Sequence, residues 1–291
     1  MNLIYVYPGG CKLAFSKLKE LYFIDIIIII GLVLYAILFY KSKINFFVLL
    51  CNIFLLQAWI PDINVNFSLN GPAWYLSLAF FLYLCFPYII KIVKKISNSG
   101  IRKLWCWIGL IYILQAVLSL IIYTMNLDEQ IKIWFTYMFP MFRIGDFIIG
   151  CLCAEVIKKT KDSENVIFDS VLEAISIILL IITIIIRIKI GDDCLTRTIL
   201  YSPCVVFLIV SFARENGIIT KYFSRINFIN IISKVSDIGF IIHYPILLFI
   251  SIIVKHFFGN SKYIIFIFTF AITIAIAYIY KYLLKRILRK P

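Results

Sequence analysis

Two residues of opposite charge stand three positions apart inside a long apolar run, residues 133–157. They are Arg143 and Asp146, in the segment FPMFRIGDFIIGCLCAE. Residues three apart lie on the same face of a helix, and each charge in a membrane costs about 3 kcal/mol unless it is paired or hydrated. One interpretation is an ion pair that holds helices together. The other is that Arg143 binds an anion or oxyanion in a polar cavity, oriented by Asp146.

Another apolar run, residues 236–254, contains a histidine that is followed by tyrosine and proline. A neutral His243 can accept or donate a proton during catalysis. It can equally donate a hydrogen bond to a backbone carbonyl freed by Pro245. The sequence leaves both roles open.

A loop-to-helix junction at the start of the apolar run 73–92 contains several polar and small residues. Asn70 is suited to an N-cap and Gly71 to a tight turn. Trp74 is expected at the outer membrane interface, with Ser77 three residues further on the same face. Each of these residues, taken alone, also has an ordinary structural interpretation.

The elements that must position these residues are transmembrane helices. Of the 291 residues, 63% are hydrophobic and 15% are charged, whereas soluble domains have about 45–50% and 25%. An all-α polytopic bundle of eight or nine membrane segments, with no soluble domain, is therefore expected. The apolar runs are 22–40, 46–59, 73–92, 104–125, 133–157, 171–190, 196–213, 236–254 and 262–284.

The net charge of +14 comes mainly from short loops between the apolar runs. Basic loops indicate the cytoplasmic side and contact with anionic lipid, not nucleic acid. Basic residues follow the third, fifth, seventh and ninth runs, which predicts a multi-pass protein of the plasma (inner) membrane with a cytoplasmic C-terminus. The eight cysteines and two histidines lack metal-ligand spacing, so no metal site is expected.

The run 46–59 is short for a membrane span and contains Asn52 and Gln57. Nine full crossings would separate the basic N-terminal residues from the cytoplasmic side. If the segment 46–59 is re-entrant, eight crossings remain, and the basic residues at both ends of the chain lie on the cytoplasmic side. Because such a segment must line protein or water, residues 46–72 are expected close to a functional cavity.

Four segments, taken together, resemble the acyltransferase-3 family, and the resemblance covers nearly the whole chain. Leu55–Pro87 resembles the family's "W-S-L-x-x-E … Y-L … F-P" helix, and Phe139–Val156 its "F-R-x-x-(D/E)-F-x-x-G" helix. Ser233–Phe249 resembles "S-Y-x-x-Y-L-x-H-x-P", and Phe15–Phe23 resembles the basic "R-x-x-R-x-Y-P" segment. The order of the four segments is that of the family.

The resemblance implies a membrane O-acyltransferase, similar to O-antigen acetylases, that modifies a carbohydrate outside the membrane. The donor would be acetyl-CoA or another acyl-CoA, used as a substrate with no resident cofactor, and the acceptor a glycan or a lipid-linked sugar. The implied partners are therefore the lipid bilayer, acyl-CoA and the carbohydrate. The implied site residues are Arg143, Asp146 and His243 for catalysis, Asn70, Trp74, Ser77 and Tyr244 for the substrate, and Lys17 and Lys19 for the phosphates of coenzyme A.

This chain departs from the family pattern at several positions. Ala79 stands at the glutamate of "W-S-L-x-x-E", Tyr75 at its serine, and Phe23 at the proline of the basic segment. The family's two first helices, which carry an arginine and the histidine base, have no counterpart, and no histidine precedes His243. The expectation is one acyltransferase-3-like domain over residues 1–291 that is incomplete at its N-terminus.

Three functions follow as hypotheses. The first is an acyltransferase performing O-acetylation of an exported polysaccharide or a similar surface carbohydrate. The second is an inactive remnant, or a binding subunit, of that family. The third is a transporter of lipid-linked sugars, which would move its substrate without acyl chemistry.

Overall fold

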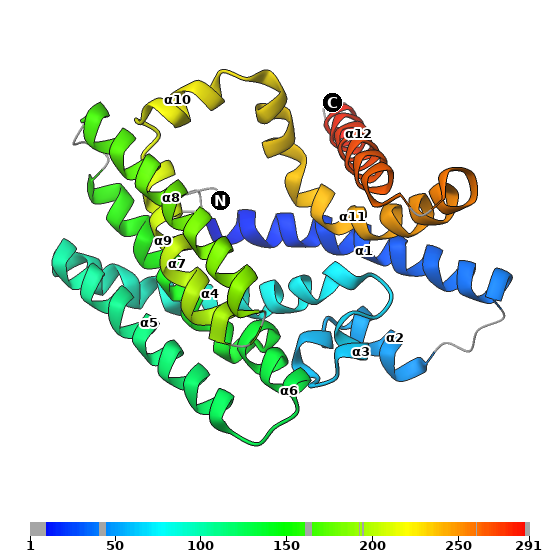
Figure 1. Cartoon of the computed structure of the whole chain (residues 1–291), viewed down its shortest axis with the longest axis horizontal. Coiled ribbons are helices and arrows are strands. Elements are labelled where there is room, and N and C mark those ends of the chain that lie inside the picture. The colour runs from blue at the N-terminus through cyan, green and yellow to red at the C-terminus, as the bar shows by residue number, and fades with distance from the viewer. Residues whose placement is uncertain are drawn as a thin grey trace. The chain divides into compact units, whose positions relative to one another are not determined.

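The computed structural model describes residues 10–40, 45–160, 165–191, 193, 195–259 and 261–288. Over these ranges the chain is almost wholly helical and contains no strand (Figure 1). It divides into two compact units. The first unit contains residues up to 16, 58–63 and 77–223, and the second contains 17–57, 64–76 and 224–291.

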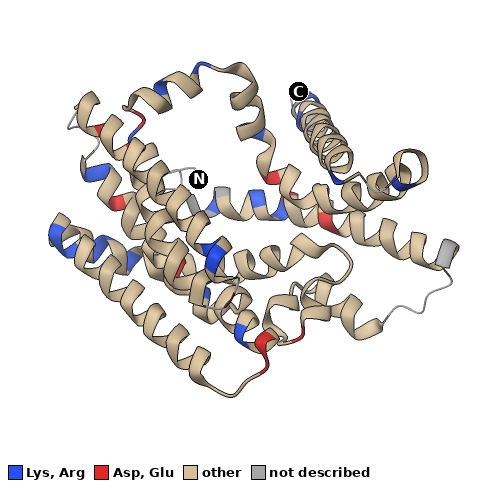
Figure 2. Cartoon of the chain, viewed as in Figure 1, with Lys and Arg blue, Asp and Glu red and all other residues tan. Residues whose placement is uncertain are grey.

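Six helices among the described residues are long and apolar enough to cross a membrane. Long stretches of these helices carry no charge, and most basic residues lie near helix ends (Figure 2). The prediction of an all-α, multi-pass membrane protein is thereby confirmed. The six helices are α1 (Gly10–Tyr40), α4 (Trp74–Asn98), α5 (Ile101–Thr124), α8 (Val166–Ile190), α11 (Asn227–Phe258) and α12 (Lys262–Leu288).

Two further apolar runs form helices of a different kind. The run 133–157 gives α6 (Glu129–Ile133), a π-helical turn and α7 (Pro140–Thr160), which is 21 residues long but carries several charged residues. The run 196–213 gives a π-helical turn (Thr196–Leu200) and α9 (Tyr201–Phe212), which has only 12 residues. These two helices are therefore shorter or more polar than the six spanning helices.

The first unit is held together by the packing of α5, α7, α8 and α9. Helix α7 packs against α5 and α9, and α9 packs against α8. The core between α4, α5 and α7 is apolar and includes Phe86, Val93, Leu104, Leu152 and Val156. A further short helix, α10 (Ile218–Ser224), follows α9.

The small residues of α7 differ in what they contact. A Cβ atom placed on Gly145 would lie 2.6 Å from the side chain of Gln115 on α5, whereas one on Gly150 would meet nothing within 4 Å. Gln115 is fixed there because its amide donates to the carbonyl of Phe142 at 3.2 Å. A neighbouring helix therefore approaches α7 closely at Gly145 and not at Gly150.

Gly145→Val is expected to destabilise the first unit by about 1–3 kcal/mol, because the added methyl groups displace Gln115 from a tightly packed interface. The measurement is the thermal unfolding midpoint of the purified protein in detergent. Gly150→Val is the matched control, since that position is open, and it should unfold at nearly the wild-type temperature. Equal midpoints for the two variants would contradict the packing described for α5 and α7.

The second unit contains most of α1, together with α2 (Phe46–Ile53), most of α3 (Ile63–Asn66), α11 and α12. Helices α11 and α12 form its largest contact. Asp237 on α11 pairs with Lys281 near the end of α12 at 2.7 Å and with Lys17 near the start of α1 at 3.9 Å. Lys17 and Lys281, which come from opposite ends of the chain, therefore lie beside the same carboxylate at one end of this unit.

The run 46–59 does not form a spanning helix. Helix α2 has eight residues, about 12 Å at 1.5 Å per residue, and its last carbonyl, of Ile53, accepts a hydrogen bond of 2.7 Å from the hydroxyl of Tyr22. The amide of Asn52 donates to the carbonyl of Val48 and to the hydroxyl of Ser68. The re-entrant path of this segment remains a prediction.

Candidate functional site

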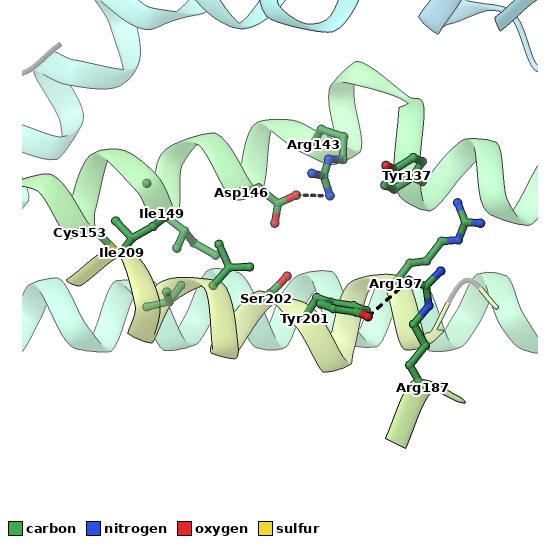
Figure 3. Close-up of a pocket in the computed structure, with 13 residues that line it drawn as sticks. Tyr137, Arg143, Asp146, Ile149, Cys153, Arg187, Arg197, Tyr201, Ser202 and Ile209 are labelled. Carbon is green, nitrogen blue, oxygen red and sulfur yellow. Dashed lines mark hydrogen bonds and ion pairs between the residues drawn. The ribbon is translucent and has the colours of Figure 1, made fainter. Parts of the chain in front are cut away.

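A cavity of about 570 Å³ lies among α7, α8 and α9 of the first unit. Its lining includes three arginines and one carboxylate, that of Asp146. Arg143 belongs to the first turn of α7, Arg187 to the last turn of α8, and Arg197 to the π-helical turn before α9. Because these helices alternate in direction, the three half-buried arginines meet at one end of the cavity (Figure 3).

Direct contacts hold the arginines in place. The Nη1 atom of Arg143 lies 2.7 Å from the Oδ2 atom of Asp146, which confirms the predicted ion pair. The guanidinium of Arg197 lies 4.9 Å from the ring centroid of Tyr137, and Arg187 donates to the hydroxyl of Tyr201 at 3.3 Å. Aromatic faces attract guanidinium groups, so the two tyrosines help to fix the positions of the cations.

The opposite end of the cavity is apolar. Ile149, Cys153 and Ile209 lie away from the arginines in Figure 3. Val205 and Val206 complete this apolar lining. The cavity therefore has a cationic end and a hydrocarbon-like end.

His243 lies in the second unit, on α11. Its Nδ1 atom is 2.7 Å from the carbonyl oxygen of Phe240. A carbonyl can only accept, so Nδ1 carries the hydrogen and Nε2 of the neutral ring has a free lone pair. The side chain also lines a mainly apolar cavity of about 550 Å³ between α11 and α12. This geometry is compatible with proton acceptance at Nε2.

Asn70 and Tyr244 also belong to the second unit. The Nδ2 atom of Asn70 donates to Oδ1 of Asp25 at 2.6 Å and to the carbonyl of Ile241 at 3.2 Å. Asn70 occupies the predicted N-cap position, before the 3-10 turn Gly71–Ala73, but its side chain makes no capping bond and pairs with the Asp25 carboxyl group instead. The ring of Tyr244 packs beside Gly71, where a Cβ atom would lie 3.5 Å from it.

Asp25 was missed by the sequence analysis. Both Asp25 and Asn70 are fully buried, and Asp25 lies near the middle of α1, between Ile24 and Ile26. The available signal was a lone carboxylate within an apolar run, which in a membrane helix marks a residue with a specific partner.

Asn70→Ala is expected to destabilise the protein by about 1–3 kcal/mol, because it leaves a buried carboxylate without its hydrogen-bond donor. The thermal unfolding midpoint in detergent is the measurement. Asn98→Ala removes an exposed asparagine from the end of α4 and should leave the midpoint unchanged. A wild-type midpoint for Asn70→Ala would show that the Asp25 contact contributes no stability.

The remaining predicted residues are Ser77, Trp74, Lys17 and Lys19, and they differ in burial and contacts. Ser77 is fully buried and its hydroxyl accepts a bond of 3.3 Å from the backbone amide of Ala58. Trp74 is also buried. Lys17 pairs with Asp237, while Lys19 is exposed. The structure thus places Arg143 and Asp146 together in the first unit, and Asn70, Tyr244 and His243 in the second.

These features describe a polytopic helical membrane protein with charged groups held inside its helical units. The chain is 28% identical over 117 residues to the acyltransferase MdmB of Streptomyces mycarofaciens. The match covers 37% of this chain and 29% of that relative, so the chain spans less than a third of the relative's length. No family model and no solved structure matches the chain. The similarity supports acyl transfer in general.

Proposed function

We propose that the chain is a membrane O-acyltransferase of the acyltransferase-3 type. It moves an acyl group, acetyl by default, from acyl-CoA to a hydroxyl of a cell-surface or exported carbohydrate. The observation that carries the proposal is the similarity to acyltransferase MdmB. The four segments that resemble the acyltransferase-3 family and the polar residues inside the helices support it.

The reaction needs one group that accepts a proton and another that stabilises a negative charge. The acceptor oxygen forms a bond to the thioester carbon, the carbon–sulfur bond breaks, and the hydroxyl proton passes by way of a base to the leaving thiolate. In this proposal Nε2 of His243 accepts that proton. Arg143, held by Asp146, binds a negatively charged group of the substrate or an oxyanion in its cavity.

The basic end of the second unit is proposed as the place where the donor binds. Lys17 and Lys19 near the start of α1 would attract the phosphates of coenzyme A. This assignment places that end, and with it the C-terminus, on the cytoplasmic side of the plasma membrane. The residues proposed to position or contact the carbohydrate are Asn70, Trp74, Ser77 and Tyr244.

The test is the release of free coenzyme A from acetyl-CoA by the purified chain in detergent. We expect release that depends on an added carbohydrate acceptor and that leaves an ester-linked acetyl group on that acceptor. Binding of acetyl-CoA without release would instead indicate an inactive member or a binding subunit. Movement of a lipid-linked sugar across liposomes without coenzyme A release would indicate a transporter.

A further inference from the structure

Three arginines from three helices share the cationic end of the cavity in the first unit. A guanidinium presents a planar fork of donors that matches phosphate oxygens, two at a time. Among the residues that line the cavity, the arginines contribute three positive charges and Asp146 one negative charge. The hydroxyl groups of Tyr201 and Ser202 add neutral polar groups to the lining. This end is therefore suited to a phosphate group.

The cavity changes character with depth along the helices. Ile149 and Cys153 follow Arg143 on α7 by six and ten residues, which places them about 9 and 15 Å further along the helix axis. Ile209 is similarly deep on α9, well past Arg197 (Figure 3). Arginines near helix ends and apolar residues deeper in the bundle match the polarity profile of a membrane leaflet.

We infer that this cavity binds a phosphate group carried on a hydrocarbon chain, with Arg187 and Arg197 as phosphate ligands beside Arg143. The phosphate lies at the cationic end and the chain extends toward Ile149 and Ile209. The tyrosine rings at Tyr137 and Tyr201 hold the two added guanidinium groups in position. The role of this amphiphile as the anchor of the carbohydrate acceptor rests on the proposed function; its binding does not.

The experiment is calorimetric titration of the full chain, purified in a neutral detergent, with farnesyl phosphate. Farnesol and inorganic phosphate are titrated separately, so that the hydrocarbon chain and the phosphate group are each tested alone. Farnesyl phosphate is expected to bind at least about tenfold more tightly than either, since a charge-assisted contact accounts for a factor of this size. Equal binding of farnesol, or of inorganic phosphate, would overturn the inference.

Arg187→Gln and Arg197→Gln should each weaken farnesyl phosphate binding by about tenfold. Lys189→Gln is the matched control, because Lys189 is exposed on α8 two residues from Arg187 and does not line the cavity. Arg187→Lys and Arg197→Lys keep the charge but lose the fork, so they should bind with intermediate affinity. These conservative variants preserve the test if a glutamine variant fails to fold.

Wild-type affinity in all four arginine variants would overturn the assignment. A loss in Lys189→Gln as large as in Arg187→Gln would also overturn it, since general electrostatic attraction would then explain the binding. No acyl donor is present in the titration. Phosphate recognition can therefore fail while acyl transfer is found, or succeed while acyl transfer is absent.

Discussion

Arg143→Ala lowers the rate of acyl transfer by about 100-fold or more if its guanidinium stabilises negative charge during the reaction. The side chain lines the cavity of the first unit and is held by Asp146 at 2.7 Å. Alanine removes the positive charge and leaves no donor at that place. The measurement is the initial rate of acetyl transfer, compared at equal amounts of folded protein.

Two controls separate chemistry from stability. Arg102→Ala removes an exposed arginine from α5 and should transfer acetyl groups at the wild-type rate. The double variant Arg143→Ala, Asp146→Asn removes the carboxylate charge that the single variant leaves unpaired. If the double variant recovers full activity, the loss came from the unpaired Asp146, and Arg143 has no role in binding negative charge.

His243→Gln should abolish turnover, by a factor of about 100 to 10,000, without reducing the amount of folded protein. The glutamine amide can still donate to the carbonyl of Phe240, but it cannot accept a proton near neutral pH. The chain contains only one other histidine, His256, which is exposed near the end of α11. His256→Gln is therefore the matched control and should be fully active.

Retained activity in His243→Gln would assign the histidine to helix stability. Its bond to Phe240 would then be a local contact within α11, because the carbonyl that Pro245 leaves without its helical donor is that of Ile241, which accepts from Asn70. A variant with lower yield and normal specific activity would support that structural role. The two measurements, yield and specific activity, therefore decide between the interpretations that the sequence left open.

The helical architecture was predictable because a membrane leaves few alternatives to long apolar helices. Runs such as 171–190 and 262–284 correspond closely to α8 and α12. The run 46–59 was less predictable, because a break after eight helical residues depends on contacts such as that of Ile53 with Tyr22. Local composition does not contain those contacts.

Part of the candidate site was also predictable. Arg143 and Asp146 share a helix face by their spacing alone. In the sequence Arg187 stands near the end of the run 171–190 and Arg197 near the start of the run 196–213. Their meeting with Arg143 depends on how α7, α8 and α9 pack. Asp25 and Asn70 lie 45 residues apart, so their hydrogen bond is likewise a product of tertiary structure.

The most direct test of the proposed function is the transfer of a labelled acetyl group from acetyl-CoA to carbohydrate by the purified wild-type chain. We expect an ester-linked label on the carbohydrate that is cleaved by hydroxylamine and that forms far more slowly with Arg143→Ala or His243→Gln. The proposed function would be contradicted by a folded wild-type protein that leaves every carbohydrate acceptor tested unlabelled, with coenzyme A release no greater than without protein.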